Sequence, residues 1–128
     1  MLFYLQAGVM VQGLHREEIG EFLLKEALDE HKHVEEFSRL IVQLGGIPGQ
    51  EVSSFPTDMT CPKEILKYAQ HMEQEVSNIY SKRMQMTCNP CPEEGGVETY
   101  VNLFYEDQLQ DSQATALEIG LFTKPYFK

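Results

Sequence analysis

The apolar residues between Ile19 and Leu44 recur at steps of three and four positions. This spacing is typical of an amphipathic α-helix that buries one face, and it predicts a helix from about Arg16 to Leu44. The same face also carries ionisable side chains between the apolar ones, namely Glu26, Glu30 and His33. The pattern therefore predicts a helix whose buried face carries carboxylate and imidazole groups at positions where apolar side chains are usual.

Three further helices are expected from the same kind of spacing. A short and almost wholly apolar one runs from Leu2 to about Val11. Another begins at Pro62, a residue that suits the first helical position, and the last runs from Val97 to about Leu121. The apolar face expected for this last helix consists of Tyr100, Phe104, Ala114, Leu117 and Leu121. The Gly45-Gly46-Ile47-Pro48 stretch ends the Arg16 helix, and residues 50–60 form a crossing loop. No strand-type alternation is present, so the fold class is all-α, an antiparallel four-helix bundle with a shortened first helix.

Composition limits the function classes. The 128 residues are 42% hydrophobic, which suits one domain over residues 1–128 with a core of its own. The net charge of −10 and the lack of a Lys/Arg run argue against nucleic-acid binding and favour cations as partners. The longest apolar stretch, Met1 to Val11, is too short to cross a membrane and lacks the basic start of a signal peptide. We expect a cytoplasmic protein with no membrane contact.

The three cysteines do not form a disulfide framework for a chain of this size. Cys88 and Cys91 form a C-x-x-C motif, but a zinc site of that kind needs a second pair of ligands, which the chain lacks. Cys61 and Cys88 lie near opposite ends of one expected helix, about 40 Å apart, so they cannot share a metal within one subunit. A redox or metal role for Cys88 and Cys91 stays open beside a purely structural loop.

The Glu30-x-x-His33 pair is the strongest chemical signal in the chain. Residues three apart share a helix face, and burying a carboxylate and an imidazole without partners costs several kcal/mol each. In helix bundles such an inward-facing pair is a ligand set of di-iron and di-manganese sites. Glu73 and Asp107 interrupt the apolar faces of the third and fourth helices near mid-length. The alternative is that these residues lie on solvated faces, since helix-face assignments from sequence drift by a residue or two.

A family resemblance rests on two stretches. Residues Glu30 to Phe37, followed by Leu44-Gly45-Gly46-Ile47-Pro48, resemble the second helix and following turn of the bacterioferritin branch of the ferritin-like superfamily. Residues 58–67, Met72-Glu73-Gln74 and Met86-Thr87 resemble the third helix of the Dps-like proteins called thioferritins. The resemblance implies a four-helix bundle around a di-iron centre, ferroxidase chemistry with peroxide or oxygen, and hollow homo-oligomeric cages that store iron.

The resemblance also implies roles for single residues. Glu30 would bridge two metal ions, His33 would ligate one of them, and Glu73 would be the third-helix carboxylate. Asp107 falls on the family's bridging Glu of the fourth helix and Gln110 on its His, so a second ion would be weakly held.

Other family positions depart from the pattern. The family's first-helix ligand Glu falls before Met1, so either the chain is truncated or its gene starts late. The thioferritin cysteine positions read Glu75 and Met84 here. The haem-ligating Met of bacterioferritins is replaced by His31. A haem role for His31 stays open beside the simpler interpretation of an exposed histidine.

The leading hypothesis is a homo-oligomeric ferritin-like protein that binds and stores or detoxifies iron through a degraded di-iron site. At most one ion is expected to bind tightly, manganese or zinc are alternatives to iron, and any ferroxidase activity is expected to be weak. The second hypothesis is a structural or partner-binding protein of ferritin fold that has lost its metal site. A rubrerythrin-like peroxidase, the third, would need two C-x-x-C motifs, and the chain has one.

Overall fold

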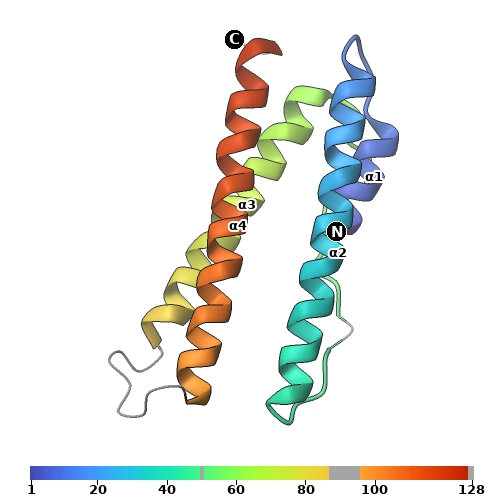
Figure 1. Cartoon of the computed structure of the whole chain (residues 1–128). Coiled ribbons are helices and arrows are strands. Elements are labelled where there is room, and N and C mark those ends of the chain that lie inside the picture. Colours follow the sequence, from blue (N-terminus) through green and yellow to red (C-terminus); the bar gives the residue numbers. More distant parts are fainter. Residues whose placement is uncertain (50, 87–95, 127–128) are drawn as a thin grey trace. The chain divides into compact units, whose positions relative to one another are not determined.

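The computed structural model of the chain describes residues 1–49, 51–86 and 96–126 (Figure 1). These residues form four helices and no strand: α1 (Leu2–Met10), α2 (Arg16–Gln43), α3 (Pro62–Met86) and α4 (Val97–Tyr126). The predicted all-α fold class is confirmed, and so is the short first helix of nine residues. No helix in the described part of the chain is long and apolar enough to span a membrane.

The helix ends follow the sequence signals closely. Helix α2 stops where Gly45 adopts a φ of +86°, a left-handed conformation that glycine takes without steric cost. The Gly45 amide donates to the Val42 carbonyl and the Gly46 amide to the Ile41 carbonyl, which satisfies two orphan acceptors of the last turn. Helix α4 differs from its predicted end, because it continues past Leu121 to Tyr126.

The chain divides into two compact units, Met1–Ile65 and Leu66–Lys128. In the first unit α1 packs closely on α2, because glycines meet where the helices touch. A Cβ on Gly20 would lie 3.0 Å from the Gly8 carbonyl oxygen. The core of this unit is apolar and consists of Phe3, Tyr4, Ala7, Val11, Ile19, Leu23, Ala27, Leu40 and Ile65. The single domain over residues 1–128 stays a prediction.

The connection from α2 to α3 also belongs to the first unit. It leaves the C-terminal end of α2 and returns to the α1 end, where the Gln12 amide donates to the Thr60 carbonyl at 3.0 Å. Its Phe55 ring contacts the Phe3 ring edge-to-face, with centroids 6.4 Å apart. The connection therefore runs back along the whole of α2, as the predicted crossing loop requires.

In the second unit α3 and α4 pack against each other as an antiparallel pair. The Gln70 amide of α3 donates to the Ala116 carbonyl of α4 at 3.2 Å, and the Tyr80 ring lies 5.9 Å from the Tyr105 ring. As α3 advances from Gln70 to Tyr80, its contacts on α4 move backwards from Ala116 to Tyr105. We call the surface where these two helices meet the α3–α4 seam.

Candidate metal centre

Helix α2 places Glu30 and His33 together on one face. The His33 Nδ1 lies 3.6 Å from the Glu30 Oε1, and the two side chains are 16% and 24% exposed, respectively. They are thus mostly buried and lie one turn apart on the helix. This arrangement agrees with the face predicted from the apolar spacing, and it gives a metal ion two adjacent donors of the right chemistry.

Glu26, one turn before Glu30, is more deeply buried than either residue of the pair, with 6% of its surface exposed. The apolar spacing predicts this position on the inner face as well. The same face carries the buried Leu23 and Leu40 on either side of the ionisable residues. The inner face of α2 is therefore apolar near both ends and polar between them.

Glu73 occupies the middle of α3 and is 4% exposed. Its helix face also carries the buried Leu66 and Ala69. The alternative that Glu73 lies on a flank in water is therefore wrong for this residue. A carboxylate at this depth requires hydrogen-bonding or charged partners, since an isolated buried charge is costly.

The face predicted for α4 needs correction. The residues expected to pack inward, among them Tyr100, Leu117 and Leu121, are more than half exposed. The buried residues of α4 are instead Gln108, Ser112, Ala116 and Ile119. Apolar residues are spread around most of this helix, so their spacing did not select one face, and the face that packs on α3 is partly polar.

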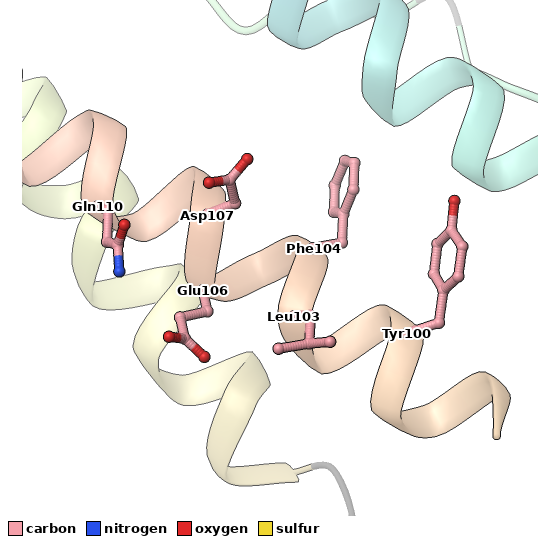
Figure 2. A pocket seen from close by; sticks show the side chains of 6 residues that line it. All are labelled: Tyr100, Leu103, Phe104, Glu106, Asp107 and Gln110. Atoms are coloured by element: carbon pink, nitrogen blue, oxygen red, sulfur yellow. The ribbon is translucent and has the colours of Figure 1, made fainter. Parts of the chain in front are cut away.

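Asp107 and Gln110 are therefore exposed. Asp107 lies directly before the buried Gln108, and Gln110 lies between the buried Gln108 and Ser112. Asp107 and Gln110 line an open pocket together with Tyr100, Leu103, Phe104 and Glu106 (Figure 2). In Figure 2 the Asp107 side chain projects to the same side of α4 as Phe104, whereas Glu106 projects to the side of Leu103. Their placement among inward-facing positions is wrong, and a ligand role for Asp107 stays a prediction.

The four predicted ligands divide between the two units. Glu30 and His33 belong to Met1–Ile65, whereas Glu73 and Asp107 belong to Leu66–Lys128. Within residues 1–49, 51–86 and 96–126, no three His, Cys, Asp or Glu side chains form a group that could hold a metal ion. The Glu30–His33 pair alone is thus short of a complete set of metal ligands.

The other candidate site residues give less support for a metal centre. His31 is exposed on α2, and Cys61 is exposed just before α3. Cys88 and Cys91 lie outside the described residues. A second His–Glu pair does appear on α3, where the His71 Nε2 lies 3.1 Å from the Glu75 Oε1, but both side chains are more than 60% exposed.

A comparison with known protein families shows to which family the chain belongs. A sequence profile described as a ferritin-like domain matches residues 1–115, which include parts of both units. The chain belongs to the ferritin-like domain family. The all-α, ferritin-like four-helix bundle predicted from the sequence is thereby confirmed as the fold class. No curated protein and no solved structure is significantly similar to the chain.

The reasoning from sequence missed three buried polar residues of this ferritin-like chain. Ser77 on α3 is 2% exposed, and Gln108 and Ser112 on α4 are 3% and 4% exposed. The available signal was their spacing, because Ser77 follows Glu73 by four residues and Ser112 follows Gln108 by four. Neutral polar residues are common on solvated faces, so this spacing did not stand out.

Proposed function

We propose that this ferritin-like protein binds a divalent first-row metal ion, foremost iron, at a site built on Glu30 and His33. The observation that supports this proposal is their geometry, a mostly buried carboxylate and imidazole 3.6 Å apart on the inner face of α2. Such mixed oxygen and nitrogen donors suit iron, manganese or zinc. Glu73 and Asp107, the two candidate ligands of the other unit, stay predictions from the sequence in this proposal.

The proposed site is an incomplete version of a di-iron centre. Two adjacent metal ions repel each other, and bridging carboxylates offset that repulsion. Gln110 is a neutral amide where the family resemblance implies an imidazole, and Asp107 is exposed. We therefore expect one ion per chain to bind tightly. Iron bound there would supply electrons to oxygen or peroxide, and we expect this oxidation to be slow.

Titration calorimetry with Co(II), or with Fe(II) in the absence of oxygen, tests the proposal. The informative variant is Glu30→Ala/His33→Ala, which removes both donors of α2. The matched control is His71→Ala/Glu75→Ala, which removes an exposed His–Glu pair of the same chemistry. We expect one ion per chain for the wild type and the control, and a loss of at least tenfold in affinity for the Glu30/His33 variant. Equal binding by all three proteins would refute the site.

The second candidate function is a ferritin-fold structural or partner-binding protein without a working metal site. It is favoured by the lack of any three-residue ligand group in the described part of the chain and by the exposure of Asp107. The same titration separates the two functions. A wild-type chain that binds no ion above the level of the Glu30→Ala/His33→Ala variant would support the second.

We further propose a homo-oligomer of the bacterioferritin-related, Dps-like kind. Its support is the apolar surface that α1 and α2 leave exposed, including Leu5 and Val9 at about half exposure and Leu28 at 70%. Exposed apolar surface of this extent favours association. Light scattering at micromolar concentration tests this, and a monomeric mass would contradict it.

A further inference from the structure

The α3–α4 seam changes character along its length. Near the start of α3 it is apolar, with Leu66 and Ala69 on one helix and Ala116 and Ile119 on the other, all buried. Towards the end of α3 it is aromatic, where Tyr80 meets Tyr105. Between these ends all the buried residues are polar, namely Glu73, Ser77, Gln108 and Ser112. We call these four residues the polar layer.

The α3–α4 contacts on either side of the polar layer show which of its residues lie at the same level. Starting from the Gln70–Ala116 hydrogen bond, three residues forward on α3 reach Glu73, and four residues back on α4 reach Ser112. Starting from the Tyr80–Tyr105 contact, three residues back on α3 reach Ser77, and three forward on α4 reach Gln108. Because the helices are antiparallel, Glu73 lies at the level of Ser112, and Ser77 lies at the level of Gln108.

Ser77 is the residue of this layer whose hydrogen bonding is incomplete. Its side chain is 2% exposed, and its Oγ has no hydrogen-bond partner among the described residues. A serine inside a helix commonly donates to the carbonyl four residues earlier, but Ser77 does not. Buried polar atoms nearly always have a partner, in the protein or in an ordered water molecule, because leaving them without one costs free energy.

We propose that the polar layer is a binding site for one internal water molecule, which joins the Ser77 hydroxyl to the Gln108 side chain. A buried water needs two to four polar neighbours, and this layer provides them. The Ser77 hydroxyl and the Gln108 amide can each donate and accept a hydrogen bond, and Ser112 adds a second hydroxyl. An apolar ligand would leave the Ser77 hydroxyl without a partner, so the site selects water.

The water would also influence Glu73. Glu73 and Ser77 are one turn apart on α3, so a water on the Ser77 Oγ can donate its remaining hydrogen bond towards the carboxylate. The polar layer would then hold the Glu73 carboxylate in one orientation inside the second unit. This inference concerns α3 and α4 alone and does not depend on metal binding.

A double-mutant cycle of thermal unfolding tests the water site. Ser77→Ala and Gln108→Leu each remove one proposed partner of the same water molecule. We expect each to lower the unfolding midpoint by roughly 2–5 °C, the shift that the loss of about one buried hydrogen bond produces in a chain of this size. The combined variant should shift the midpoint by clearly less than the sum of the two, because the second change removes a water that is already lost.

The matched control is Ser81→Ala, one turn further along α3 and only partly buried. Its effect should be small and should add to that of Gln108→Leu. A crystal structure of the wild type should show a water molecule within hydrogen-bonding distance of the Ser77 Oγ. A Ser77→Ala variant with a raised midpoint, additive shifts for Ser77 and Gln108, or a wild-type structure with no water at Ser77 would each overturn the proposal.

Discussion

Replacing Gly20 by alanine should destabilise the first unit, although alanine is the better helix former. The added Cβ would lie 3.0 Å from the Gly8 carbonyl oxygen, against 3.4 Å or more for most real Cβ contacts. The backbone of α2 fixes the position of the Cβ, and the oxygen belongs to the backbone of α1, so no side-chain rotation can relieve the contact. Helix α1 would have to move away from α2 by a few tenths of an ångström, which loosens the packing of the core residues around it.

The magnitude follows from two opposing terms. Overpacking a well-packed site costs about 1–3 kcal/mol. Alanine recovers roughly 1 kcal/mol relative to glycine inside a helix. The two terms leave about 0–2 kcal/mol, so we expect Gly20→Ala to lower the free energy of unfolding by about 1 kcal/mol, or the unfolding midpoint by roughly 3–5 °C. Urea denaturation followed by circular dichroism measures the first quantity, and a thermal scan measures the second.

Two other glycines provide graded controls. At Gly8 the nearest atoms to an added Cβ are side-chain carbons of Leu24, at 2.9 and 3.0 Å, and the nearest backbone atom, the Gly20 carbonyl oxygen, lies farther away at 3.3 Å, so Gly8→Ala should cost less than Gly20→Ala. At Gly49 nothing lies within 4 Å, so Gly49→Ala should be neutral or slightly stabilising. A Gly20→Ala protein as stable as the wild type would mean that α1 and α2 do not cross this closely in solution.

Three further changes have defined outcomes. Gly45→Ala should cost about 1 kcal/mol in urea denaturation, because its φ of +86° suits only glycine well, and an unchanged midpoint would argue against this helix end. Gln70→Leu should cost about 0.5–1.5 kcal/mol by removing the hydrogen bond to the Ala116 carbonyl, and amide exchange on α4 should report the loosening. Arg16→Ala should cost about 1 kcal/mol through the lost bond to the Val11 carbonyl at 3.0 Å, whereas Arg16→Lys should recover part of it.

The amino-acid sequence by itself determined the helices and most of their ends. Local signals decide these features, because glycine at Gly45 permits the left-handed residue that ends α2, and Pro62 fits the first turn of α3. The apolar spacing of α2 also fixed its inner face, since Glu26 is buried and the Glu30–His33 pair is mostly buried on it. On this helix the apolar residues gather on one side, so the periodicity points in a single direction.

The tertiary structure decided which face of α4 is buried. Apolar residues surround α4, and its buried residues include Gln108 and Ser112, which no hydrophobic pattern selects. Asp107 is exposed for the same reason, one position away from the buried Gln108. The spacing of apolar residues shows only which face of a helix is the more apolar. The pairing of polar groups between two helices depends on the register of one helix against the other. That register exists only after the chain has folded.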